Sequence, residues 1–287
     1  MTIAITGATG HLGGEIIEEL LRLGTSSNSI VPVIRNKAKA ATFARRGMSP
    51  RIASYEDHGA LRNAFDGARE MVLISSPVLN NAIRVQQLHN AVTAAHSVGV
   101  KHLIYIGLAA PEKQAFGLEE VELATEYLIR ALGVPFTFIR NGVYFDELRS
   151  ELEIAAKTGV LPSATGNQPL NWALRRDMAC AVAAVLHQKG HEWKTYELTA
   201  AQAFTYDDLA TALSQTTGRR VTHHQTDPAS AVRALTDSGM PSEHASTIVE
   251  DFQTPIAHRK FTDHNDTLTD FTGRPTDPAT SIRTLFR

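Results

Sequence analysis

Cysteine is almost absent from this chain of 287 residues, in which Cys180 is the only one. A single thiol excludes an internal disulfide and is typical of a protein from a reducing compartment. Cys180 lies in the apolar helical stretch MACAVAAVL, which favours a buried packing role over that of a nucleophile. We therefore expect neither a disulfide framework nor cysteine chemistry.

Long apolar runs are missing as well. No stretch approaches the roughly 18–20 apolar residues that a membrane-spanning helix requires. The N-terminal residues do not show a basic leader followed by an apolar segment and a small-residue cleavage site. We therefore expect a cytoplasmic protein.

Neither sign of charge is in excess. The chain has 28 Lys and Arg against 30 Asp and Glu, a formal net charge of −2. Proteins whose main task is to hold nucleic acid or an anionic membrane need surplus positive charge. The composition therefore argues against both classes of partner.

Strand-like and helix-like segments alternate in the first half of the chain. Helical patterns at 13–23 and 82–99 separate short β-branched runs. The runs lie at 2–6, 30–34, 51–54 (the weakest), 70–75, 102–106 and 134–139. Apolar strands alternating with helices are typical of a parallel sheet covered on both faces. The pattern predicts an α/β fold with a Rossmann doubly wound parallel sheet.

Helical segments dominate after about residue 142. They are expected at 146–158, 177–188, 206–217, 228–238 and 244–252, with one strand at 194–200 and a loop at 161–169. Asp177 and Thr205 precede such segments as candidate N-caps. We expect an NAD(P)-binding Rossmann domain at 1–142 and a smaller, mostly helical substrate lobe at 143–287, packed on it.

Three glycines directly after the first strand form the pattern G-A-T-G-H-L-G. Gly7 suits a tight turn, Gly10 lets the backbone approach a pyrophosphate, and Gly13 permits close packing of the helix on the sheet. The N-terminus of the following helix attracts phosphate. The alternative, a turn that serves packing alone, does not require all three spacings. The predicted dinucleotide contacts are Gly7, Ala8, Thr9, Gly10, His11, Leu12 and Gly13.

The end of the second strand indicates which dinucleotide binds. NAD sites place an acidic residue there, about 20 residues after the glycines, to accept hydrogen bonds from the ribose. Here the segment is VPVIRNKAK, which contains Arg35 and two lysines but no acid. A guanidinium can pair with a 2′-phosphate, which favours NADPH. The alternative, that these are solvated surface charges, fits Lys39 better than Arg35.

Six motifs occur in order along the chain: TGATGHLGG, VPVIRN, LISSP, VKHLIYIGLA, IRNGVYFDEL and RRDMACAVAAVL. Together they resemble the NmrA-like branch of atypical short-chain dehydrogenases, and within it the bacterial NAD(P)H:quinone oxidoreductases. The likeness spans nearly the whole chain. It implies NADPH-dependent hydride transfer to a quinone-type acceptor and a homodimer.

The resemblance also implies further site residues. The ribose and pyrophosphate would be bordered by Ser75, Ser76 and Pro77. The nicotinamide and substrate would meet at Arg140, Asn141 and Gly142. The quinone pocket would be lined by Asn141, Tyr144 and Phe145. The alternatives are a plain strand end at the two serines and a core position for the phenylalanine.

A Tyr-x-x-x-Lys pair, in which the Tyr donates a proton and the Lys lowers its pKa, is absent. This argues against alcohol oxidation or sugar epimerisation by that route. A quinone accepts hydride readily and can take its protons from water, so no tuned acid is required. The catalytic residues are therefore unknown.

The chain departs from the reductases of this branch at Tyr127. They tend to carry Lys there, in a Thr-Glu-Lys context, whereas this chain has Thr125, Glu126 and Tyr127. The loss leaves open a second function, a non-catalytic NADP(H)-binding redox sensor or regulatory protein.

The twelve histidines do not form a recognisable metal motif. His223 and His224 are adjacent and would point to opposite faces of a strand. We predict no metal site, and no Ser-His-Asp signature stands out in the sequence.

Overall fold

The computed structural model describes residues 2–113, 117–274 and 277–286. The chain forms two compact units. The first contains Met1–Asn141 and Arg176–Glu197, and the second contains Gly142–Arg175 and Leu198–Arg287. The sequence-based division at residue 142 thus needs one correction, because residues 176–197 return to the first unit. They carry a helix of that unit and a strand that joins its sheet.

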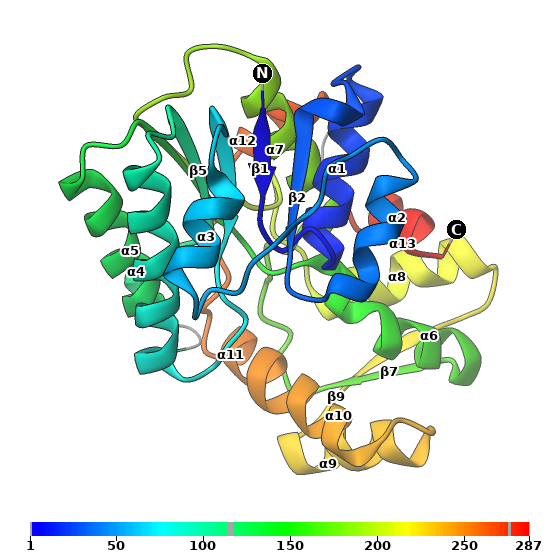
Figure 1. Ribbon diagram of the computed structural model, residues 1–287. Coiled ribbons are helices and arrows are strands. Elements are labelled where there is room, and N and C mark those ends of the chain that lie inside the picture. The colour runs from blue at the N-terminus through cyan, green and yellow to red at the C-terminus, as the bar shows by residue number, and fades with distance from the viewer. Residues whose placement is uncertain (1, 114–116, 275–276, 287) are drawn as a thin grey trace. The chain divides into compact units, whose positions relative to one another are not determined.

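A seven-stranded sheet forms the centre of the first unit, in the order β3-β2-β1-β4-β5-β6-β8 (Figure 1). The strands are β1 (Ile3–Ile5), β2 (Ile30–Ile34), β3 (Arg51–Ile52), β4 (Glu70–Ile74), β5 (His102–Leu108), β6 (Phe136–Asn141) and β8 (Lys194–Leu198). The pairs from β3 through β6 are parallel, and Ile3 of β1 faces Ile30 on one side and Glu70 on the other. The predicted Rossmann fold is confirmed.

Helices cover both faces of this sheet (Figure 1). One face carries α3 (His58–Phe65), α4 (Asn81–Ser97) and α5 (Glu119–Ala131), whose apolar residues join the strands in one core cluster. The other face carries α1 (His11–Arg22) and α7 (Arg175–His187). A short helix, α2 (Ala40–Ala44), follows β2. With both faces covered, all residues of β1 and β2 are buried, which explains their continuous apolar runs.

The second unit is mostly helical, as expected. Its helices are α6 (Arg149–Thr158), α8 (Tyr206–Thr217), α9 (Pro228–Asp237), α10 (Ser242–Thr247), α11 (Thr254–Ala257), α12 (Thr267–Thr272) and α13 (Pro278–Leu285). A π-helix, η5 (Ile248–Gln253), lies between α10 and α11. Two strands, β7 (Val160–Ser163) and β9 (Thr222–Gln225), pair in parallel.

Several local predictions can now be compared with the structure. Thr205 is the N-cap of α8, as predicted, and it also forms a capping box with Asp208. The Asp177 prediction was wrong, because α7 begins at Arg175 and Asp177 lies in its first turn. There its charge suits the positive helix terminus. Part of the predicted loop at 161–169 is strand β7, and β9 was not expected.

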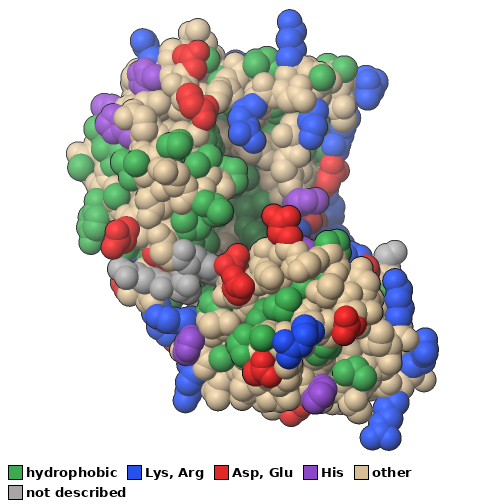
Figure 2. Space-filling view, turned by 90° about the horizontal axis from the view of Figure 1, so that it is seen from below, with side chains coloured by type: hydrophobic (Ala, Val, Ile, Leu, Met, Phe, Trp, Pro, Cys, Tyr) green, Lys and Arg blue, Asp and Glu red, His purple; other side chains and the backbone are tan. Residues whose placement is uncertain are grey.

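The surface carries charges of both signs. On the face drawn in Figure 2, Lys and Arg side chains are interspersed with Asp and Glu, in keeping with the net charge of −2. None of the helices within the described residues is long and apolar enough to cross a membrane.

Candidate functional site

The carboxyl ends of the parallel strands meet at one edge of the sheet. The chain leaves β1 for β2 on one side, while β4 lies on the other side of β1. This reversal of strand order is the position at which open α/β sheets bind ligands. The segments that follow β1, β2, β4 and β5, with the end of β6, therefore form the candidate site.

The glycine loop after β1 has the geometry of a phosphate cradle. Gly7 has a φ of +61°, in the left-handed region that favours glycine, and its carbonyl accepts from the Gly10 amide at 2.9 Å. A Cβ at Gly13 would lie 2.8 Å from the Gly7 carbonyl carbon. The close approach predicted for Gly13 is thus to the loop itself rather than to the sheet.

The start of α1 is open to an anion. Gly10 is the N-cap and offers no side-chain hydrogen bond to the first turn, which contains no acidic residue. Of the predicted contacts, Gly7, Thr9, Gly10 and His11 are exposed, while Ala8, Leu12 and Gly13 are buried. The buried members can contribute backbone groups only. Backbone amides and the helix terminus fit a phosphate group here.

Arg35 is the first residue after β2, and its side chain is exposed. Asn36 caps the short turn that follows by accepting from the Ala38 amide at 2.9 Å. No acid occupies residues 35–39. The surroundings of Arg35 therefore fit a phosphate better than a bare ribose.

Tyr55, which follows β3, was not among the site residues predicted from the sequence. Its hydroxyl donates to Thr6 Oγ1 at 2.6 Å and lies 2.7 Å from the Ile74 carbonyl, at the ends of β1 and β4. Burial raises the pKa of this phenol well above its ordinary value. Tyr55 thus ties the segment after β3 to the candidate site, and no local sequence signal indicates it.

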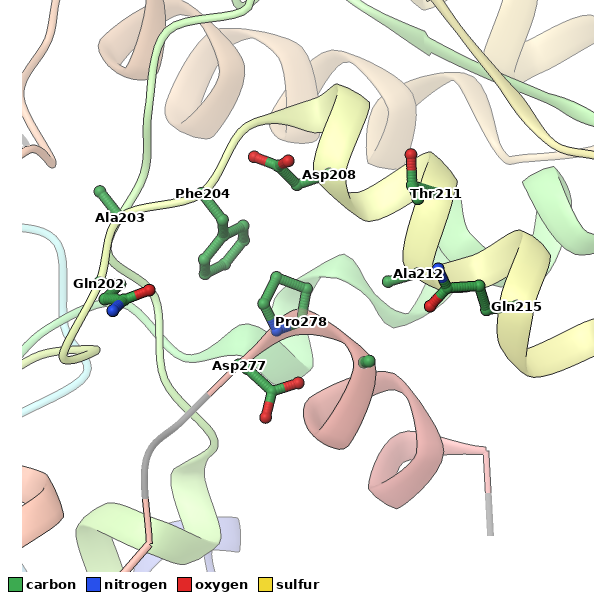
Figure 3. A pocket seen from close by; sticks show the side chains of 10 residues that line it. Gln202, Ala203, Phe204, Asp208, Thr211, Ala212, Gln215, Asp277 and Pro278 are labelled. Carbon is green, nitrogen blue, oxygen red and sulfur yellow. The ribbon is translucent and has the colours of Figure 1, made fainter.

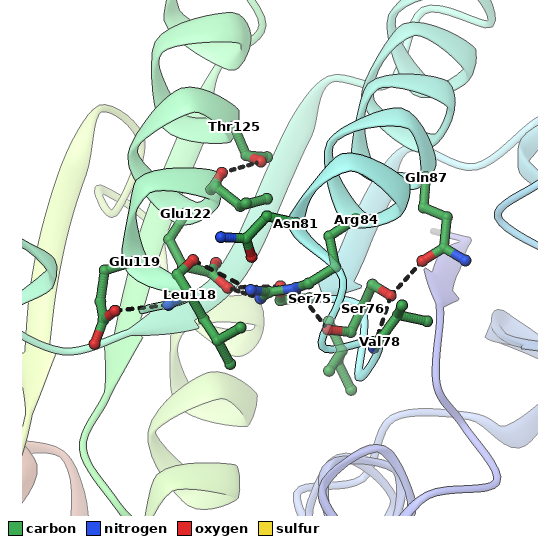
Figure 4. Close-up of polar contacts among 12 residues, drawn as sticks. Ser75, Ser76, Val78, Asn81, Arg84, Gln87, Leu118, Glu119, Glu122 and Thr125 are labelled. Carbon is green, nitrogen blue, oxygen red and sulfur yellow. Dashed lines mark hydrogen bonds and ion pairs between the residues drawn. The ribbon is translucent and has the colours of Figure 1, made fainter. Parts of the chain in front are cut away.

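The two serines after β4 are engaged within the first unit (Figure 4). Ser75 Oγ donates to Glu122 at 2.8 Å, and Ser76 Oγ donates to Gln87. Pro77 is exposed. The hydroxyls therefore fix the shape of this segment, which leaves its backbone and Pro77 as the groups able to border a ligand.

Arg140, near the end of β6, does not fit its predicted role as a cofactor contact. Its guanidinium donates to both carboxylate oxygens of Glu126 at 2.8 and 2.9 Å and to Glu197 at 2.8 Å. These hydrogen bonds, those to Glu126 first, raise the pKa of Arg140 further. In this structure it is an ion-pair residue that joins β6 to α5 and β8.

Asn141 is the last residue of β6 and is 2% exposed. Its carbonyl accepts from the Ala109 amide at 2.8 Å. The next amide along the chain, that of Ala110, donates to Glu197 of β8 at 3.0 Å. These two hydrogen bonds connect the residues that follow β5 with the end of β6 and with β8.

The remaining predicted residues belong to the second unit. The Gly142 amide donates to the Leu198 carbonyl at 2.8 Å. The ring of Tyr144 is partly exposed and lies under the Arg175 guanidinium, 4.6 Å from ring centre to carbon. Phe145 is fully buried and packs on Phe204, so it is a core residue rather than a pocket wall.

Tyr127, where the resemblance implies a Lys, lies on α5 with 68% of its surface exposed. Its neighbour Glu126 is the partner of Arg140. The Thr-Glu-Tyr segment therefore supplies an ion pair to the fold.

A hydrogen-bonded Ser-His-Asp chain occurs in the second unit, although no sequence signature predicted it. Asp207 contacts His223 Nδ1 at 2.8 Å, and His223 Nε2 contacts Ser163 Oγ at 2.7 Å. Ser163 is fully buried, while the Asp207 side chain is 64% exposed. A nucleophile must reach its substrate, so this chain is structural. Among the described residues there is also no cluster of His, Cys, Asp and Glu able to hold a metal ion.

The second unit contains a cavity of about 390 Å³ (Figure 3). Its lining residues are Gln202, Ala203, Phe204, Asp208, Thr211, Ala212, Gln215, Asp277, Pro278 and Ala279. The two carboxylates that line it serve the N-termini of helices: Asp208 in the capping box of α8, and Asp277 as the N-cap of α13. The cavity thus contains none of the predicted site residues.

Comparison with known proteins identifies the family. The model of the NmrA-like family matches residues 1–276. The chain belongs to the NmrA-like family. This NmrA-like chain is 35% identical to quinone oxidoreductase 2 of Escherichia coli over 285 residues, 99% of this chain and 98% of that protein.

Two solved structures are similar to it over the full length. The NADPH-dependent quinone oxidoreductase of Escherichia coli, complexed with NADPH, has a TM-score of 0.87 at 34% identity and 100% coverage of both chains. The triphenylmethane reductase of Citrobacter sp., complexed with NADP(H), has a TM-score of 0.92 at 33% identity and covers 99% of this chain and 100% of its own.

Proposed function

We propose that this NmrA-like protein is an NADPH-dependent oxidoreductase that transfers hydride from the nicotinamide to a quinone-type acceptor. The observation that carries the proposal is the open helix terminus at the glycine loop, with Arg35 and no acid at the end of the next strand. The near full-length similarity to a quinone oxidoreductase supports the same reaction.

The glycine loop and Arg35 would hold the cofactor. Amides at the start of α1 would bind the pyrophosphate, and Arg35 would pair with the 2′-phosphate. When bound, the reduced nicotinamide supplies the hydride. The fit rests on the loop geometry, since a side chain at Gly13 would collide with the backbone of Gly7.

The protein's remaining task is to orient the acceptor and exclude water. We keep Tyr144, whose ring is partly exposed, as a proposed acceptor contact and withdraw Asn141 and Phe145, whose side chains are buried. No side chain is assigned as a proton donor, because a reduced quinone can take its protons from water. The absence of a Tyr-x-x-x-Lys pair is consistent with this chemistry.

A second candidate function is an NADP(H) sensor without turnover. It is favoured by Tyr127 in place of the Lys of related reductases. Such a protein would bind the same cofactor through the same loop and change its affinity for a partner.

The deciding experiment mixes the purified protein with NADPH and 1,4-benzoquinone and follows the absorbance of the reduced nicotinamide against a blank without protein. We expect saturable oxidation that is slower with NADH. Tight NADPH binding in calorimetry without oxidation would instead support the sensor. Failure to bind NADPH would contradict both functions.

The assembly and location are also proposals. We propose a homodimer, which sedimentation equilibrium tests directly, and the cytoplasm, consistent with a single cysteine.

A further inference from the structure

One side of α4 carries polar residues where a helix packed on a sheet usually carries apolar ones. Asn81, Arg84 and Gln87 are spaced three residues apart and so lie along one side of the helix (Figure 4). Arg84 is 2% exposed and Gln87 is 4% exposed. We call these three residues the α4 polar stripe.

Arg84 contacts two chain segments at the carboxyl edge of the sheet. Its Nε donates to the Ser76 carbonyl at 3.2 Å and its Nη1 to the Leu118 carbonyl at 3.1 Å. Its Nη2 donates to Ser75 Oγ at 3.0 Å and forms an ion pair with Glu122. One guanidinium thus connects the segment after β4 with the segment before α5.

Glu122 completes this arrangement from α5. Besides Arg84, it accepts hydrogen bonds from Ser75 Oγ at 2.8 Å and from the Tyr105 hydroxyl. A Cβ at Gly107 of β5 would lie 2.7 Å from the Glu122 carboxylate, so the glycine makes room for the acid. Both carboxylate oxygens are therefore used.

The other members of the stripe reach neighbouring segments. Asn81 Nδ2 donates to the Gly117 carbonyl at 2.9 Å. Gln87 accepts from Ser76 Oγ and donates to Glu56, which follows β3. A single helix face thus contacts the segments after β3, β4 and β5.

A gain in stability does not by itself explain why Arg84 and Glu122 are buried as an ion pair. Removing two charges from water is costly, and apolar residues of similar volume often stabilise a core as well as a buried ion pair does. An ion pair does, however, define the geometry of the groups that it bonds. Apart from Glu122, the groups that Arg84 bonds belong to loops: the Ser76 and Leu118 carbonyls and the Ser75 hydroxyl.

The strand order indicates which half of the cofactor these loops would meet. Arg35 follows β2 on one side of β1, whereas β4 and β5 lie on the other side. With the 2′-phosphate at Arg35 and the pyrophosphate after β1, the nicotinamide half extends over β4 and β5.

We propose that Arg84, paired with Glu122, is a positioning residue that shapes the segments 75–77 and 117–118 into the nicotinamide half of the cofactor site. This inference rests on the proposed function. Arg84 itself touches neither cofactor nor acceptor; it acts through the loops that it bonds.

The variant Arg84→Lys tests the proposal. Lysine keeps the charge but lacks the planar fork that serves the Ser76 and Leu118 carbonyls together. Calorimetry then compares NADPH with adenosine 2′,5′-bisphosphate, which lacks the nicotinamide half. We expect NADPH affinity to fall about tenfold, the effect of losing about one hydrogen bond, and bisphosphate affinity to stay unchanged. The kcat with 1,4-benzoquinone falls as well.

Two further measurements keep the proposal testable if the Arg84→Lys variant does not fold. Glu122→Gln leaves the Arg84 charge unpaired and is expected to repeat the selective loss. Hydrogen exchange on the wild-type chain needs no variant, and NADPH is expected to protect the segment 75–78 more than the bisphosphate does. Arg46→Lys is the matched control, because Arg46 pairs with Glu18 at the surface at 2.7 Å and both affinities should be retained.

The possible results distinguish failure of this inference from failure of the proposed function. Equal loss of both ligands, in step with a lowered Tm, would mean general loosening and overturn the proposal, as would unchanged NADPH binding in Arg84→Lys. Equal protection of 75–78 by the two ligands would do the same. Wild-type protein that binds neither ligand would overturn the proposed function, and this inference with it.

Discussion

Arg35 follows β2 and Arg140 lies near the end of β6, so both stand at the carboxyl edge of the sheet, yet their guanidinium groups have different surroundings. Arg140 is surrounded by carboxylates, whereas Arg35 is exposed beside a short basic turn. The sequence places both at the binding edge and cannot separate them, because the partners of Arg140 come from helices and strands far along the chain. Of the two, Arg35 is therefore the residue that we propose to pair with the 2′-phosphate.

Replacing Arg35 with Asp is expected to weaken the use of NADPH far more than that of NADH. The change removes a charge-assisted hydrogen bond of about 1.5–3 kcal/mol and places a carboxylate against the 2′-phosphate. We expect kcat/KM for NADPH to fall about 10- to 100-fold, with little change for NADH. Arg45→Asp, at another exposed arginine, is the charge-matched control. Equal losses with both cofactors would contradict the role of Arg35.

Cys180 is expected to react slowly with thiol reagents. It is half-buried on α7 rather than fully buried, and burial, with the nearby Glu19 carboxylate, raises the pKa of its thiol to about 11. The thiolate is the reactive form, so the alkylation rate should rise with pH up to about that value. The chain unfolded in denaturant is the control. Fast labelling of the folded protein at neutral pH would contradict the packing role.

At the scale of single elements, the second unit depends on a buried carboxyl. Glu151 of α6 is 2% exposed, and it accepts from the Tyr206 hydroxyl of α8 at 2.9 Å and from Gln253 of η5 at 3.0 Å. Gln253 in turn accepts from the Ala164 amide at 2.9 Å, next to β7. Burial raises the pKa of Glu151 from 4.5 to about 7. One side chain thus links α6, α8, η5 and the end of β7.

This raised pKa predicts a loss of stability at higher pH. The folded chain holds the proton more tightly than the unfolded chain does, so the stabilisation is complete below pH 4.5 and is lost as pH rises through about 7. The shift corresponds to a loss on the order of 3 kcal/mol in the free energy of unfolding. Urea titrations of wild type and Glu151→Gln across this range measure it. Parallel pH profiles for the two proteins would contradict the assignment.

Elements differ in how well local sequence predicts them. Helix α8 begins at Tyr206, and the two residues of its capping box, Thr205 and Asp208, lie within four consecutive positions of the sequence. Strands β7 and β9 pair Leu161 with His223, across 62 positions, and their sequences VLPS and THHQ lack an alternating apolar pattern. The strand state there depends on a partner that local propensity does not contain.

At the scale of the whole molecule, the parallel sheet brings residues that are far apart in the sequence to one edge, where they form the candidate site. The carboxyl ends of β1 to β6 reach one edge because every pair from β3 through β6 runs in the same direction. The chain returns to the first unit for residues 176–197, which carry most of α7 and β8, and a division by sequence position misses this return. The experiment with NADPH and 1,4-benzoquinone tests the function of this assembled edge.

The sequence by itself determined the strand–glycine loop–helix unit, the absence of an acid after β2 and the α/β architecture. Each of these depends on neighbours in the chain or on periodicity, which can be read locally. Only the tertiary structure decided that Arg140 and Phe145 are structural, that Ser75 and Ser76 are hydrogen-bonded inside the fold, and that Arg84 meets Glu122 across 38 positions. The physical reason is that a buried polar group must find a partner, and that partner is chosen by packing rather than by sequence distance.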